Sequence, residues 1–139
     1  MKKVLILCTG NSCRSIMAEA MINHYLGDKW EAFSAGVSPS WVNPRSVQVL
    51  QELEISTSDL RSKSVYEFLD RDDLDLVITV CDNARETCPV FFKPVEQVHI
   101  GIEDPVSYTY VPDEAALAGF RRCREQIRET ILSYLASSG

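Results

Sequence analysis

The chain has 139 residues, of which 45% are hydrophobic and 24% are charged, and its formal net charge at pH 7 is −6. This length suits one domain with a single core, and no apolar run approaches the roughly 20 residues that span a bilayer, which excludes a membrane-spanning protein. The acidic balance argues against nucleic acid as a partner, because phosphate backbones are bound by basic surfaces. An anionic substrate would therefore need a pocket of positive local charge.

Short apolar runs alternate along the chain with segments of helical periodicity. The first run, residues 4–7, ends well short of the ~7–15 apolar residues of a signal peptide, so we predict a buried strand and a cytoplasmic protein. Val, Ile and Leu mark the other strands, and apolar residues at three- and four-residue spacing mark the helices. In chain order, the predicted elements are strand 4–7, helix 15–26, strand 31–34, helix 44–53, helix 64–70, strand 74–80, strand 95–100 and a final helix over 113–135.

This alternation predicts a parallel sheet with helices on both faces. We expect residues 1–139 to form one α/β domain with three layers, α/β/α, around a four-stranded parallel sheet. Ligands of such sheets bind beyond the carboxyl ends of the strands. Residues 8–15 follow the first strand, so they are the first place to look for a site.

The segment CTGNSCRS, residues 8–15, has the composition of an anion-binding turn. Five residues separate Cys8 from Arg14, and they can curl so that their backbone N–H groups point inward. Because a helix begins at Ser15, its N-terminus and the Arg14 guanidinium would favour a thiolate at Cys8 and hold a tetrahedral oxyanion. The alternative interpretation is a packing cysteine beside a surface arginine. The predicted oxyanion-binding residues are Thr9, Gly10, Asn11, Ser12, Cys13, Arg14 and Ser15.

Two further thiols follow the strand predicted at 74–80. Cys81 should lie near Cys8, because the carboxyl ends of both strands meet at one edge of the sheet. The polar residues 82–87 should form a flexible segment that ends at another thiol, Cys88. In a reducing compartment such thiols are more often reactive than structural, although two buried structural cysteines remain the alternative. A zinc site is disfavoured, because C-x6-C lacks the usual ligand spacing, and we predict no metal site here.

The motif CTGNSCRS resembles the phosphate-binding loop of the low-molecular-weight protein tyrosine phosphatase superfamily. The resemblance covers essentially the whole chain and implies the fold of that superfamily. It also implies that Cys8 attacks the central atom of an oxyanion, that Arg14 binds the equatorial oxygens, and that Asp104 is the general acid for the leaving group. Besides the loop, the similar segments are Met17-Ala18-Glu19-Ala20, Ser34-Ala35-Gly36 and Asp104-Pro105.

Two enzyme classes share this loop, and the additional thiols favour one of them. The arrangement of Cys8, Cys81 and Cys88 resembles the thioredoxin-coupled arsenate reductases, which implies a relay. In that relay Cys8 attacks arsenate, Cys81 displaces arsenite from Cys8, and Cys88 passes the disulfide on to thioredoxin. Glutaredoxin with glutathione is the alternative reductant. A tyrosine phosphatase is the alternative function, and weak phosphatase activity is compatible with the reductase.

A third interpretation is a catalytically idle anion sensor, which an intact general acid at Asp104 argues against. The resemblance further implies a monovalent cation site, because in some family members the positions matching Asn11, Glu19 and Ser34 help to form one. We otherwise expect no tightly bound cofactor, and we expect the protein to act as a monomer.

The remaining aromatic and cysteine residues near these segments have simpler expected roles. Cys13 and Cys123 should be packing thiols, Cys123 because it neighbours apolar residues of the last helix. Tyr108 and Tyr110 lie where phosphatases keep aromatic residues at the rim of the pocket, which supports the alternative function. Trp41 could also form a rim, although a single loop tryptophan more often packs on its neighbours.

Overall fold

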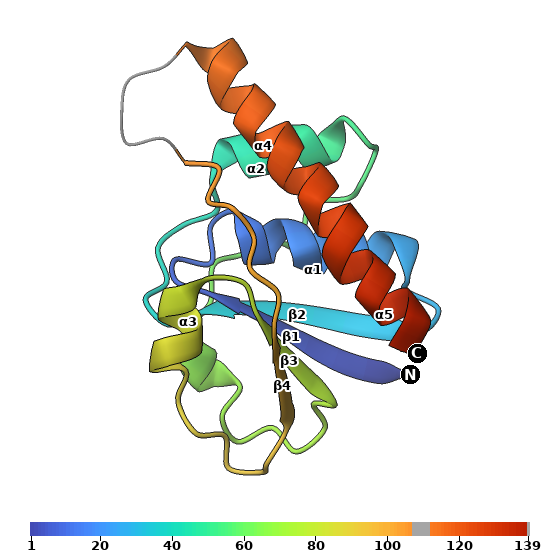
Figure 1. The fold of residues 1–139 in the computed structure, drawn as a ribbon, viewed down its shortest axis with the longest axis vertical. Coiled ribbons are helices and arrows are strands. Elements are labelled where there is room, and N and C mark those ends of the chain that lie inside the picture. The colour runs from blue at the N-terminus through green and yellow to red at the C-terminus, as the bar shows by residue number, and fades with distance from the viewer. Residues whose placement is uncertain (107–111, 139) are drawn as a thin grey trace.

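The computed structural model of the protein describes residues 1–106 and 112–138, and it shows a central sheet with helices over it (Figure 1). The strands are β1 (Lys2–Cys8), β2 (Trp30–Gly36), β3 (Leu76–Thr79) and β4 (Glu96–His99). The helices are α1 (Arg14–Tyr25), α2 (Pro44–Gln51), η1 (Val65–Glu67), α3 (Asp82–Thr87), α4 (Asp113–Ile127), η2 (Arg128–Leu132) and α5 (Ser133–Ser138). In these described residues, no helix combines the length and apolarity needed to cross a membrane.

The four strands form one parallel sheet in the order β2-β1-β3-β4, which confirms the predicted fold class. Leu7 pairs with Ala35 of β2 and with Thr79 of β3, so the carboxyl ends of these three strands lie level. Cys8, the last residue of β1, pairs with Gly36. The segments that follow β1, β2 and β3 therefore meet at one edge of the sheet.

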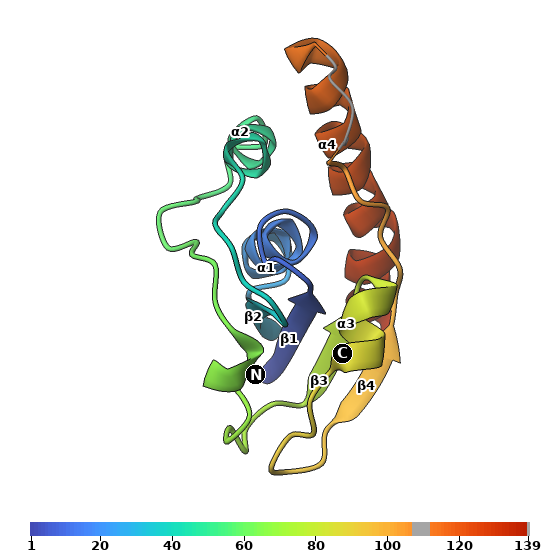
Figure 2. The same cartoon turned by 90° about the vertical axis from the view of Figure 1, so that its left-hand side faces the viewer.

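Two apolar clusters cover the two faces of the sheet. Val4 and Ile6 of β1 face a cluster that includes residues of α1, α2, α4 and α5, and Leu5 and Leu7 face a smaller one that includes residues of η1 and α3. Figures 1 and 2 show α1 and the α4–α5 helix over one face of the sheet. Because β1 is buried on both faces, its residues from Val4 onward are uniformly apolar.

The two largest departures from the predicted elements are at residues 82–87 and 64–70. Residues 82–87, predicted to be flexible, form α3, where Ala84 is buried and its backbone N–H donates to Cys81 Sγ at 3.4 Å. The polar sequence does not predict this helix, because the buried Ala84 side chain and the cap from Cys81 that support it depend on the fold. The helix predicted over 64–70 is only the 3₁₀ turn η1, whose backbone at Tyr66 is capped by the Ser64 hydroxyl.

Candidate active site

The loop between β1 and α1 surrounds the sulfur of Cys8 with polar groups. Cys8 is 2% exposed; its sulfur accepts the backbone N–H of Asn11 at 3.2 Å and lies 2.8 Å from Ser15 Oγ. Asn11 has a φ of 49°, the left-handed conformation that turns the backbone N–H groups of the loop inward. The first turn of α1 follows at once. Hydrogen-bond donors placed in this way suit a thiolate, which is the form of cysteine that acts as a nucleophile.

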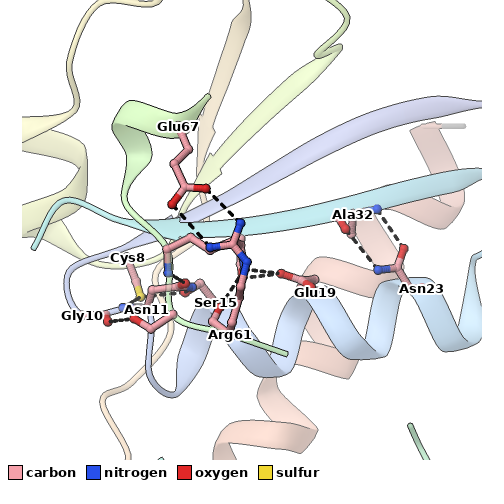
Figure 3. Close-up of polar contacts among 12 residues, drawn as sticks. Cys8, Gly10, Asn11, Ser15, Glu19, Asn23, Ala32, Arg61 and Glu67 are labelled. Atoms are coloured by element: carbon pink, nitrogen blue, oxygen red, sulfur yellow. Dashed lines mark hydrogen bonds and ion pairs between the residues drawn. The ribbon is translucent and has the colours of Figure 1, made fainter. Parts of the chain in front are cut away.

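A buried network behind the loop fixes the orientation of these groups (Figure 3). Asn11 Oδ1 accepts the backbone N–H of Lys63 at 2.7 Å, and Asn11 Nδ2 donates to Ser15 Oγ at 2.8 Å. Because Ser15 accepts from Asn11, its own hydroxyl hydrogen is free to point at Cys8. Asn11 and Ser15 thus act from behind the loop. Their side chains do not line the pocket in front of it.

The pocket in front of Cys8 is an open hollow of about 280 Å³. Arg14 and Asp104 meet there, with Arg14 Nη2 at 3.7 Å from Asp104 Oδ2. The guanidinium also donates to the Ile102 carbonyl at 3.3 Å, and Asp104 Oδ1 accepts the backbone N–H of Val106 at 3.0 Å. The structure therefore brings a thiol, a guanidinium and a carboxyl group, those of Cys8, Arg14 and Asp104, to one pocket. Its lining residues are Cys8, Thr9, Gly10, Ser12, Cys13, Arg14, Asp104 and Val106.

Cys81 lies beside the loop and Cys88 lies at the far end of α3. Cys81 Sγ is 3.3 Å from Thr9 Oγ1, and Asn83 of α3 donates to the same hydroxyl at 3.0 Å. Cys88 is half-buried against the smaller apolar cluster, and this burial raises the pKa of its thiol. Neither sulfur lines the pocket of Cys8, and no two of these cysteines are joined by a disulfide.

Burial raises the pKa of the Cys13 thiol, and it raises the pKa of Cys123 to about 12, as expected for packing thiols that stay protonated at neutral pH. Trp41 is exposed, contrary to the packing expected of it, and does not line the pocket. Tyr108 and Tyr110 lie outside the described residues. Among the described residues, no cluster of His, Cys, Asp or Glu suits a metal ion.

Lys63 is a buried charged residue near the loop that sequence reasoning missed. Its side chain is 8% exposed and its ammonium lies 3.3 Å from Glu19 Oε1 and 3.4 Å from Ser34 Oγ. Glu19 in turn accepts a hydrogen bond from the Ser34 hydroxyl. No local pattern marks Lys63, because its partners come from α1 and β2.

Comparison with known proteins agrees with this geometry. The profile of the family described as low molecular weight phosphotyrosine protein phosphatase matches residues 3–138. The chain belongs to this family. Arsenate reductase 1 of Bacillus cereus is 40% identical to this chain, over 96% of this chain and 93% of the relative.

Two solved structures of arsenate reductases share the fold of this chain. One, described as an arsenate reductase in reduced state, is 31% identical with a TM-score of 0.75, and the alignment covers 100% of both chains. The thioredoxin-dependent arsenate reductase Cg_ArsC1' of Corynebacterium glutamicum is 26% identical with a TM-score of 0.68, and 99% of this chain aligns with 63% of that one.

Gly36, at the end of β2, allows the backbone of the loop after β1 to approach β2 closely. A Cβ atom there would lie 2.4 Å from the Thr9 carbonyl oxygen and 3.0 Å from the Asn11 backbone nitrogen. We expect Gly36→Ala to lower the free energy of unfolding by about 1–3 kcal/mol, because backbone rather than a flexible side chain must shift. Denaturant unfolding measures this loss.

The matched control for this prediction is Gly101→Ala, at another loop glycine. The nearest atom to a Cβ at Gly101 is His99 Nε2 at 3.5 Å, an ordinary contact. Its free energy of unfolding should stay within about 0.5 kcal/mol of the wild-type value. Equal stability of both variants and the wild type would show that the loop tolerates the added methyl group of Gly36→Ala.

Proposed function

We propose that the protein is an arsenate reductase that forms arsenite through a relay of Cys8, Cys81 and Cys88. The observation that carries this proposal is the position of Cys81, whose sulfur lies 3.3 Å from the hydroxyl of Thr9, the residue after the nucleophile. Hydrolysis of a phosphate ester needs no second thiol at that place. The arsenate reductases among the relatives support the same proposal.

In the first step the Cys8 thiolate attacks arsenic. A sulfur–arsenic bond forms and an arsenic–oxygen bond breaks, and Asp104 protonates the departing oxygen, which leaves as water. Arg14 and the loop N–H groups hold the remaining oxygens and stabilise their charge. Arsenic remains in its pentavalent state at this stage.

The second step reduces arsenic. The Cys81 thiolate attacks Cys8 Sγ, so a Cys8–Cys81 disulfide forms while the electron pair of the sulfur–arsenic bond moves onto arsenic. Arsenite then leaves in the trivalent state. Phosphorus offers no comparable two-electron reduction, so the same first step on a phosphate ester ends in hydrolysis.

The third step requires α3 to unwind. Cys88 attacks Cys81, which frees the Cys8 thiolate and leaves a Cys81–Cys88 disulfide. Across a helix their Cα atoms lie roughly 10 Å apart, at 1.5 Å per residue, whereas a disulfide joins Cα atoms within about 7 Å. The six residues of α3 bury only Ala84, so little packing opposes this change.

Thioredoxin is the proposed reductant of the Cys81–Cys88 disulfide, with glutaredoxin and glutathione as the alternative. Support comes from the thioredoxin-dependent arsenate reductase among the structural relatives. Such a relay needs a reducing compartment, so we place the protein in the cytoplasm. The monomeric state stays a prediction.

Tyrosine phosphatase activity is the second candidate function. It is favoured by the composition of the pocket, which contains Cys8, Arg14 and Asp104 but neither Cys81 nor Cys88. The family description points the same way. We expect this activity to be weak beside arsenate reduction.

A coupled assay separates the two candidates. Arsenate, thioredoxin, thioredoxin reductase and NADPH are supplied together, and arsenate-dependent oxidation of NADPH is followed, with hydrolysis of an aryl phosphate measured in parallel. The proposal requires NADPH oxidation that depends on both arsenate and this protein. Efficient ester hydrolysis without NADPH oxidation, with either thioredoxin or glutaredoxin as reductant, would favour the phosphatase.

Cys88→Ser tests the third step of the relay. The variant should release about one equivalent of arsenite per enzyme and then stop, because steps one and two use only Cys8 and Cys81. Peptide mapping should find a Cys8–Cys81 disulfide in the stalled enzyme. Wild-type protein oxidised by arsenate should instead contain Cys81–Cys88.

Cys123→Ala is the matched control, since it removes a buried thiol that lies outside the relay. This control should turn over repeatedly with thioredoxin. Multiple turnover by Cys88→Ser with thioredoxin would remove Cys88 from the mechanism.

A further inference from the structure

Lys63 occupies the place at which the family resemblance predicts a monovalent cation. Its ammonium group has three N–H donors and faces three oxygens. It donates to the Arg61 carbonyl at 2.8 Å and lies 3.3 Å from Glu19 Oε1 and 3.4 Å from Ser34 Oγ. The lysine is 8% exposed, so a positive charge is held almost out of water beside a carboxylate.

The residues at this place do not fit an additional cation. Glu19 and Ser34, two of the three predicted ligands, already contact the lysine ammonium. The third, Asn11, uses its side-chain oxygen to accept the Lys63 backbone N–H at 2.7 Å. A metal ion here would lack free oxygen ligands and would meet a like charge at close range.

The backbone of Lys63 connects this charge to the nucleophile. The Lys63 carbonyl accepts the backbone N–H of Gly36 at 2.8 Å, while its N–H holds Asn11. Asn11 donates to Ser15 Oγ, which lies 2.8 Å from Cys8 Sγ. Figure 3 shows Cys8, Asn11, Ser15 and Glu19 along this network.

We propose that Lys63 is a positioning residue whose ammonium replaces a monovalent cation, so that the nucleophile loop needs neither potassium nor sodium. The ammonium ties its own segment to Glu19 on α1 and Ser34 on β2. Because the ammonium fixes the backbone at Lys63, the Lys63 N–H keeps Asn11 oriented, and Asn11 orients Ser15 toward Cys8. The proposal concerns the loop itself, and it holds whether the loop acts on arsenate or on a phosphate ester.

The test compares wild type with Lys63→Met in potassium chloride and in tetramethylammonium chloride at equal ionic strength. Tetramethylammonium screens charge but is too large for the site. Wild-type Tm and aryl phosphate kcat/KM should be the same in both salts. Lys63→Met leaves the Glu19 carboxylate unpaired, so its Tm should fall by several degrees in tetramethylammonium and recover in potassium, with a saturable dependence on concentration.

The kinetic readout separates positioning from general stability. In tetramethylammonium, kcat/KM of Lys63→Met for the aryl phosphate should fall by up to about a hundredfold at a temperature where the variant is folded. Potassium should restore much of this loss. Ester hydrolysis needs no second thiol, so this readout remains usable even if the arsenate relay fails.

Two further variants complete the design. Lys93→Met removes an exposed lysine whose ammonium donates to the Asp72 carbonyl at 2.9 Å, away from the Lys63 network, and it should behave as wild type in both salts. Lys63→Met combined with Glu19→Gln removes both charges, so this double variant should fold without potassium, gain nothing from it, and keep a reduced kcat/KM.

Three outcomes would overturn the proposal. A potassium-specific rise in wild-type Tm or kcat/KM would show that the site takes a metal ion despite Lys63. A folded Lys63→Met with wild-type kcat/KM in tetramethylammonium would show that Lys63 does not position the loop. If Lys63→Met folds in neither salt, the double variant decides, and wild-type kcat/KM for it would also overturn the proposal.

Discussion

Cys8→Ser should abolish arsenate reduction and aryl phosphate hydrolysis together. In the proposed mechanism both reactions begin with attack by the Cys8 sulfur, and a serine hydroxyl in the same place is a much weaker nucleophile than a thiolate. Loss of the nucleophile should lower both activities by at least about 10⁴-fold. The coupled NADPH assay and the aryl phosphate assay measure the two effects on one preparation.

Cys13→Ser is the matched control for this change. Cys13 lines the same pocket, but burial raises the pKa of its thiol, which keeps it protonated and unreactive. Its substitution should change either rate by no more than a few-fold, and thermal unfolding should confirm that both serine variants are folded. Appreciable turnover by a folded Cys8→Ser protein would exclude Cys8 as the nucleophile.

Cys81→Ser should have the second-largest effect, and the effect should be selective. Without the Cys81 thiol, no sulfur attacks Cys8 Sγ, so the electron pair of the sulfur–arsenic bond does not move onto arsenic. Arsenite should therefore not form above background, even in a single turnover. Aryl phosphate hydrolysis should remain within a few-fold of wild type, because Cys8, Arg14 and Asp104 are unchanged. Chromatographic separation of arsenite from arsenate measures the first reaction.

The retained ester hydrolysis is the internal control, since it shows that the loop is intact. Thr9 contacts Cys81 at 3.3 Å, and serine can replace that contact through its hydroxyl. Loss of both activities would point to a structural role for Cys81. Arsenite release by Cys81→Ser with thioredoxin would mean that another thiol attacks Cys8, as in a glutathione-dependent reductase.

Local sequence was sufficient to predict the strand, loop and helix around Cys8. The apolar run from Val4, the turn residues after it and the start of α1 near Arg14 are neighbours in the chain. Strand alternation also predicted a parallel sheet, which placed the ends of β1 and β3 at one edge. The proximity of Cys81 to the loop follows from that topology.

Local sequence patterns do not predict the short helix at residues 82–87, and they predict too long a helix at residues 64–70. Polar side chains were interpreted as flexibility, yet the first segment is the helix α3, held by Ala84 in the smaller apolar cluster. The second segment has helical periodicity but forms only the turn η1. Its apolar side chains, such as Val65, pack in the smaller apolar cluster against the sheet. Packing against the sheet, rather than local propensity, determines both outcomes.

By itself, then, the sequence determined the nucleophile loop, the parallel sheet and the order of the thiols, since each depends on neighbouring residues or on strand alternation. Only the tertiary structure decided what supports the loop. Lys63 contacts Asn11 across 52 residues of chain and Glu19 across 44. Gly36 is needed because the Thr9 carbonyl approaches it across the sheet edge. Contacts between residues so distant in the chain leave no periodic or local pattern, because the fold alone brings them together.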